Sequence, residues 1–139
     1  MSIETIAVLG AGQMGSGIAQ IAAASGYKVI IRDIKQEFCD KGVNGIKAGL
    51  DKQVAKGKTT QEAADAIMAR ISTTVELEGV APADFVIEAA PEILSLKHDT
   101  FVQLGEICKP DAILCTNTSS MSIGEITKDC KNPERCIGM

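Results

Sequence analysis

The arrangement of apolar and polar positions predicts strands and helices that alternate along most of the chain. Six stretches are predicted to be strands, and they lie at 3–9, 27–31, 72–75, 84–87, 112–116 and 135–138. Apolar residues recur at helical spacing after residue 13, and Gly26 predicts the end of that first helix. The alternation predicts an α/β fold with a doubly wound, mostly parallel sheet.

A helical hairpin is predicted between the second and third strands. From Lys35 to Lys56, apolar residues recur at spacings of three to five and predict an amphipathic helix; they are Phe38, Val43, Ile46, Leu50 and Val54. Gly57 interrupts this pattern, and the run 59–62 (TTQE) resembles the start of a second helix that continues to Ile71. The lysines of the hairpin fit a solvated helix face, and the residues alone leave a role in ligand binding open.

A glycine motif lies between the first strand and the first helix. Gly10, Gly12 and Gly15 form G-x-G-x-x-G, which permits a tight turn, close approach of backbone to a pyrophosphate, and close helix packing. Asp33 follows the second strand, where a carboxylate accepts hydrogen bonds from the adenosine ribose. The alternative is a structural turn with an unrelated acid. Asp33 favours NAD over NADP because it repels a 2′-phosphate, and alternation directs Arg32 to the other face.

Polar residues also follow the fourth and fifth predicted strands. Glu88 and Glu92 lie at the carboxyl end of the fourth strand, which is the ligand side of an open α/β sheet. The polar segment 117–120 follows the fifth strand, and it is either a capped loop or a set of hydroxyl groups beside a nicotinamide.

Two further helices are predicted, at about 95–107 and 122–127. The first should bury Leu96, Phe101 and Leu104. His98 lies near its first turn and is predicted to be a solvated surface residue rather than a catalytic one, because no neighbour in sequence activates it.

Composition narrows the class of protein. The hydrophobic fraction of 45% and the charged fraction of 23% are those of one ordinary globular domain. A net charge of -4 argues against a general nucleic-acid surface. The chain shows no apolar run of membrane-spanning length and no leader segment, so the cytoplasm is the expected compartment. The five cysteines form no C-x-x-C pair and are expected to be buried thiols, and with a single histidine no metal site is expected.

An ordered series of motifs resembles the N-terminal domain of the 3-hydroxyacyl-CoA dehydrogenases, most closely the bacterial 3-hydroxybutyryl-CoA dehydrogenases. The matching runs are GAGQMGSGIAQ (10–20), IRDIK (31–35), KGK (56–58), DFVIEAAPE (84–92), CKPDAIL (108–114), TNTSSMSI (116–123) and PERCIGM (133–139). The resemblance covers essentially the whole chain and implies a Rossmann-like domain that binds NAD.

The resemblance also implies roles for individual residues. Those implied to contact NAD are Gly10, Ala11, Gly12, Gln13, Met14, Gly15, Asp33, Glu92, Lys97, Asn117 and Ser119. Lys52 and Lys56 match lysines that meet the phosphates of coenzyme A, and Ser119 matches the catalytic serine that hydrogen-bonds the substrate hydroxyl. Ile93 and Gly49 depart from the usual family residues.

The implied reaction is hydride transfer between a 3-hydroxyacyl-CoA and NAD, with a general base that removes the hydroxyl proton. In the family, a catalytic histidine and a helical domain that forms the dimer follow the position of Met139. His98 does not match that histidine. The chain is therefore expected to be the cofactor-binding domain and to be inactive alone, and the alternatives are a stand-alone NAD(H)-binding module and a purely structural domain.

Overall fold

Six parallel strands form one sheet in this computed structural model, which describes residues 3–89, 94–116, 126, 129–130 and 135–138. The strands are β1 (Thr5–Leu9), β2 (Lys28–Arg32), β3 (Ile71–Thr74), β4 (Phe85–Glu88), β5 (Ile113–Thr116) and β6 (Cys136–Gly138). Their order in the sheet is β3-β2-β1-β4-β5-β6, and every pairing is parallel. The chain therefore builds outward from β1 to β3 and then returns to the other side of β1. This arrangement confirms the predicted doubly wound α/β fold.

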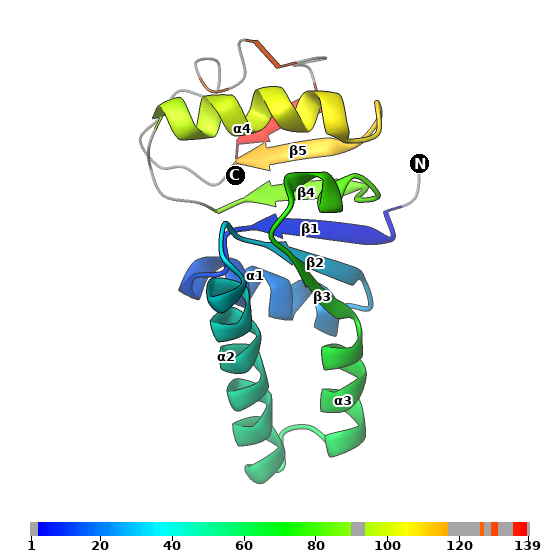
Figure 1. Cartoon of the computed structure of the whole chain (residues 1–139). Helices are drawn as coiled ribbons and strands as arrows, with labels where there is room; N and C mark the ends of the chain where they lie inside the picture. The colour runs from blue at the N-terminus through cyan, green and yellow to red at the C-terminus, as the bar shows by residue number, and fades with distance from the viewer. Residues whose placement is uncertain (1–2, 90–93, 117–125, 127–128, 131–134, 139) are drawn as a thin grey trace.

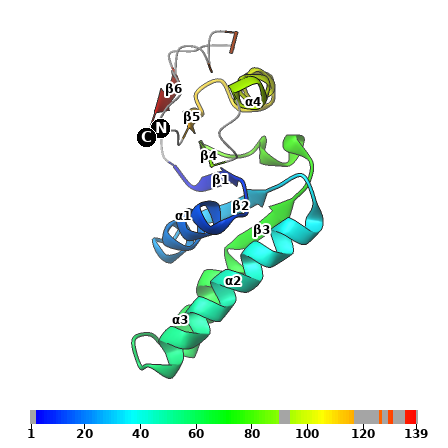
Figure 2. The same ribbon diagram turned by 90° about the vertical axis from the view of Figure 1, so that its left-hand side faces the viewer.

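Helices cover both faces of the sheet (Figures 1 and 2). They are α1 (Gln13–Ala24), α2 (Gln36–Ala55), α3 (Gln61–Ala69), the 3-10 helix η1 (Leu77–Val80) and α4 (Leu94–Ile107). Alternate residues of β1 enter different cores: Val8 packs in the core that contains residues of α1 and α2, and Leu9 in the core that contains residues of α4. Burial on both faces explains why the central strands are continuously apolar.

The predicted hairpin of α2 and α3 extends away from the sheet (Figure 1). Gly57 adopts a φ of +73° at the end of α2, and the Lys58 amide donates to the Gln53 carbonyl, which closes the helix in a Schellman motif. The Thr60 hydroxyl caps α3 by accepting a hydrogen bond from the Ala63 amide. The prediction was wrong for Ile71, which begins β3 rather than ending α3, because it pairs with Val29 of β2.

The buried face of α4 differs from the prediction by one position. Phe101 and Leu104 are buried as expected, but Leu96 is 44% exposed and Lys97 points inward instead. Positions 97, 101, 104 and 108 share one helical face, so an inward Lys97 completes the same stripe. Phe38 of α2 is likewise 40% exposed rather than part of the core.

Other predictions are met in part. All five cysteines are thiols outside disulfides, and four are buried; burial raises the pKa of Cys39, Cys108 and Cys115. The segment between β3 and β4 contains the short helix η1. The predicted helix at 122–127 lies outside the described residues apart from Ile126.

Among the described residues, none of the helices combines the length and the apolar content that a bilayer crossing requires.

Candidate functional site

The glycine motif forms the turn between β1 and α1. Gly10 has a φ of +108°, a conformation that side chains disfavour, and its amide donates to the Arg32 carbonyl of β2 at 2.8 Å. A Cβ added to Gly15 would lie 1.8 Å from the Gly10 carbonyl oxygen, so α1 starts in direct backbone contact with the turn. Both glycines therefore serve the turn and the helix packing that the motif predicts.

Gly12 meets a different requirement. It is the N-cap of α1, and a Cβ placed on it would have no described atom within 4 Å. In the described part of the chain, no side chain caps α1 and no acidic residue occupies its first turn. A helix start of this kind presents amide groups and a positive dipole end to an anion. The open approach at Gly12 fits a pyrophosphate, because only a residue without a side chain leaves the helix N-terminus uncovered.

Asp33 follows β2 and is held by the backbone around it. One carboxylate oxygen accepts a hydrogen bond from the Ala11 amide at 2.9 Å, and the other accepts from the Ile34 amide at 2.7 Å. These bonds fix the carboxylate beside the glycine turn. The Arg32 side chain instead donates to the Val75 carbonyl, consistent with the alternation expected along the strand.

A cleft of about 560 Å³ opens beside Asp33 and the glycine turn. Its lining residues are Ala11, Gly12, Gln13, Ser16, Asp33, Phe38, Lys41, Gly42 and Gly45. The contribution of α2 to this cleft was not predicted. Gly42 gives the reason for it, since a Cβ there would lie 2.7 Å from the Ala11 carbonyl oxygen. The sequence signal was a pair of glycines three residues apart in an otherwise amphipathic helix.

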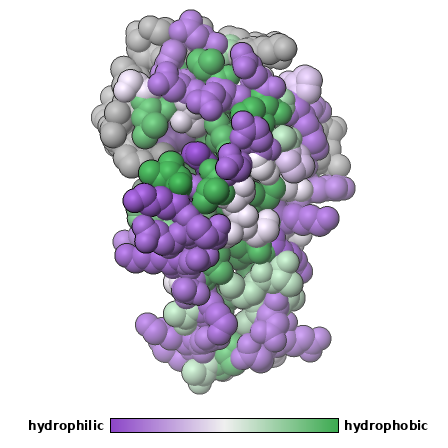
Figure 3. All heavy atoms as spheres, viewed as in Figure 1, coloured by the Kyte–Doolittle hydropathy of each residue, from purple (hydrophilic) through white to green (hydrophobic). Residues whose placement is uncertain are grey.

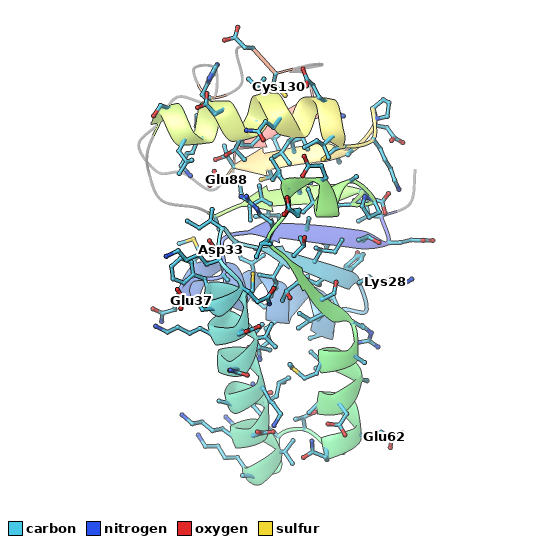
Figure 4. The ribbon with its side chains drawn as sticks, viewed as in Figure 1. Lys28, Asp33, Glu37, Glu62, Glu88 and Cys130 are labelled. Atoms are coloured by element: carbon cyan, nitrogen blue, oxygen red, sulfur yellow. The ribbon has the colours of Figure 1, made fainter. Side chains whose placement is uncertain are left out.

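A buried polar cluster lies at the carboxyl ends of β4 and β5. The Lys97 ammonium donates to both carboxylate oxygens of Glu88, at 2.7 and 2.8 Å, and the Thr116 hydroxyl donates to Glu88 at 2.6 Å. The three residues are at most 1% exposed. Figure 4 places Glu88 at the same edge of the sheet as Asp33, with Lys28 at the opposite edge. The sequence placed Glu88 at this edge but did not predict its pairing with Lys97.

The remaining predicted site residues divide into two groups. Glu92, Asn117 and Ser119 lie outside the described residues, so their roles stay predictions. Lys52 and Lys56 are both exposed; Lys52 lies in the last turn of α2, and Lys56 is the C-cap residue of that helix. Figure 3 shows hydrophilic residues over much of the far end of the hairpin.

His98 is less exposed than predicted. Its Nε2 lies 2.8 Å from a carboxylate oxygen of Asp129, and its side chain is 23% exposed. Within the described residues, no group of three or more histidine, cysteine or acidic side chains is placed to hold a metal ion.

Comparisons with known proteins agree with this geometry. A family model described as 3-hydroxyacyl-CoA dehydrogenase, NAD binding domain, matches residues 5–139. A probable 3-hydroxybutyryl-CoA dehydrogenase of Deinococcus radiodurans is 46% identical over 95% of this chain and 47% of its own length. A 3-hydroxyadipyl-CoA dehydrogenase of Escherichia coli is 42% identical over 100% of this chain and 29% of its own length.

Solved structures support the same assignment. The crystal structure of 3-hydroxybutyryl-CoA dehydrogenase from Escherichia coli superposes with a TM-score of 0.96 at 43% identity, over 99% of this chain and 29% of that one. The chain thus spans less than half the length of these relatives. The family model also confirms NAD as the cofactor of this domain type. With its glycine turn, Asp33 and strand order matching that assignment, the chain belongs to the family of NAD-binding domains of 3-hydroxyacyl-CoA dehydrogenases.

Proposed function

We propose that this chain is the NAD-binding part of an oxidoreductase that interconverts 3-hydroxybutyryl-CoA, or a similar short-chain 3-hydroxyacyl-CoA, and acetoacetyl-CoA. The observation that carries the proposal is the cleft in which Asp33 and the open Gly12 face the same space. Two relatives have names that specify butyryl and adipyl substrates. The proposal therefore covers the 3-hydroxyacyl-CoA class, with the butyryl group as the first substrate to test.

Different residues of the cleft bind different parts of NAD. The amide groups at the start of α1 bind the pyrophosphate, and Asp33 accepts hydrogen bonds from the adenosine ribose. When bound, NAD supplies the acceptor or donor of the hydride. Lys52 and Lys56 attract the phosphates of coenzyme A, and Ser119 with Asn117 binds the substrate hydroxyl beside the nicotinamide.

We further propose that turnover needs residues beyond these 139. The resemblance implies a general base and a helical domain that forms a homodimer, and general acid–base catalysis contributes about 10²–10⁴-fold to a rate. The cytoplasm is the proposed compartment. A stand-alone NAD(H)-binding module is the alternative function, and it has the same cleft without the chemistry.

Titration calorimetry and an NADH-consumption assay test the proposal together. The chain should bind NADH, Asp33→Ala should weaken that binding by at least about tenfold, and acetoacetyl-CoA should be reduced when the region that follows this domain in the family is supplied. Comparing the rates at which acetoacetyl-CoA and 3-oxoadipyl-CoA are reduced then shows which acyl group is preferred. Absence of NADH binding would reject the proposal, and binding without turnover after the region is supplied would favour the stand-alone module.

A further inference from the structure

The Glu88–Lys97–Thr116 cluster buries two charges in the domain core at a large cost in desolvation free energy. Burying an ion pair costs several kcal/mol per ion in desolvation, and apolar residues of similar volume are often equally stable or more so. The pair is 0% and 1% exposed at its side chains, and the Thr116 hydroxyl further orients the carboxylate. Such a cluster calls for a reason beyond packing, and its position in the sheet supplies one.

The cluster lies on the far side of the strand-order reversal from Asp33. Glu88 is the register partner of Leu9, the residue before the glycine turn, and the Ala89 amide donates to the Leu9 carbonyl at 2.8 Å. Dinucleotides bind across such a reversal, at the carboxyl ends of the strands. With the adenosine half beside Asp33 and the pyrophosphate at Gly12, the second half of the molecule extends toward β4 and β5.

We propose that Glu88 is a positioning residue for the nicotinamide half of the cofactor and acts through Lys97. This inference rests on the proposed NAD site. The Glu88 carboxylate fixes the Lys97 ammonium with two hydrogen bonds and neutralises its charge, while Thr116 fixes the carboxylate. Neutralisation matters because the oxidised nicotinamide ring is a cation and the reduced ring is neutral. A Lys97 charge without compensation would repel NAD+ and leave NADH largely unaffected.

The test is the ratio of the Kd for NAD+ to the Kd for NADH, measured in Glu88→Gln with ADP-ribose as a reference ligand. ADP-ribose lacks only the nicotinamide ring, so it reports on binding of the rest of the dinucleotide. Glu88→Gln should raise the ratio about tenfold while the Kd for ADP-ribose changes less than about twofold. Lys97→Met should shift the ratio in the opposite direction. A purely structural cluster would lower the melting temperature without moving this ratio.

A matched control lies at the other end of the same two strands. The Lys109 ammonium donates to Asp84 at 2.8 Å before β5 and β4 begin, so Asp84→Asn removes a more exposed ion pair from the opposite edge. It should destabilise the fold and leave the ratio unchanged. If Glu88→Gln does not fold, Thr116→Val tests the proposal instead. This variant keeps both charges and should weaken NADH binding about threefold without weakening ADP-ribose binding.

The outcomes separate the two proposals. If wild type binds NADH and ADP-ribose but the ratio in Glu88→Gln stays within about twofold of wild type, the role of Glu88 is rejected and the NAD site stands. The same holds if Thr116→Val is the variant measured and NADH is not weakened. If wild type binds neither ligand, the proposed function is rejected and the role of Glu88 with it.

Discussion

Gly15 packs so closely against Gly10 that a Cβ on residue 15 would lie 1.8 Å from the Gly10 carbonyl oxygen and 2.8 Å from the carbonyl carbon. Neither atom belongs to a flexible side chain, so the contact cannot be relieved by a rotamer change. Relief would require α1 to move away from the end of β1, and that movement would also alter the start of the helix at Gly12.

Gly15→Ala should therefore lose both stability and cofactor affinity. Overpacking typically costs about 1–3 kcal/mol, and contact with backbone places this variant at the upper end of that range. Urea denaturation measures the change in free energy of unfolding. Gly17→Ala is the control, because a Cβ there meets no described atom within 4 Å, and its better helix propensity should add about 0.5–1 kcal/mol. Equal stability of the two variants would contradict the packing argument.

The glycine turn was predictable because its residues depend on local geometry. Gly10, Gly15 and Asp33 act through the turn, the helix start and the neighbouring strand, and all three relations appear as spacings in the sequence. The contribution of α2 to the cleft was harder to predict, since the Gly42 contact with Ala11 depends on how two distant elements pack. The inward Lys97 was missed because a lysine normally faces water, and its partner lies nine residues earlier in another element.

Asp33 should determine the preference for NADH over NADPH. Its carboxylate is anchored by the Ala11 and Ile34 amides, so a 2′-phosphate would approach a fixed negative charge. Asp33→Asn should lower the ratio of the Kd for NADPH to the Kd for NADH by at least about tenfold, because it weakens NADH binding and removes the repulsion of NADPH. Fluorescence titration with both cofactors measures this. Glu37→Gln removes an exposed negative charge from the first turn of α2 and should leave the ratio unchanged.

The exposed lysines at the end of α2 should act on coenzyme A rather than on the fold. A double change of Lys52 and Lys56 to Gln should weaken acetoacetyl-CoA binding by about three- to tenfold, and added salt should reduce the difference from wild type. Acetoacetyl-pantetheine has no nucleotide phosphates and should bind the variant and wild type equally. Lys28→Gln is the matched control, because Lys28 is an exposed lysine at the start of β2, away from the hairpin lysines (Figure 4). A loss that also appears with the pantetheine compound would indicate damage to the hairpin.

Asp84 should make the stability of the fold depend on pH in the acid range. Its carboxylate accepts hydrogen bonds from the Glu4 and Thr5 amides and from Lys109, which ties the start of β4 to β1 and β5. These donors, the Lys109 ammonium first, lower the pKa of Asp84 from 3.8 to about 2. The folded state thus binds its proton less readily than the unfolded chain does, so the contribution of Asp84 is complete above the unfolded pKa and is lost as the pH falls toward 2.

Comparing wild type with Asp84→Asn by urea denaturation isolates this contribution. The difference in free energy of unfolding should be constant near neutral pH, should decrease below the ordinary pKa of 3.8, and should approach its minimum at about 2. Asp51→Asn serves as the control, because its exposed ion pair with Lys47 at 3.6 Å contributes only about 0–1 kcal/mol to the free energy of unfolding. A difference for Asp84→Asn that is the same at pH 7 and at pH 2 would contradict a pKa of Asp84 that is lowered in the folded state.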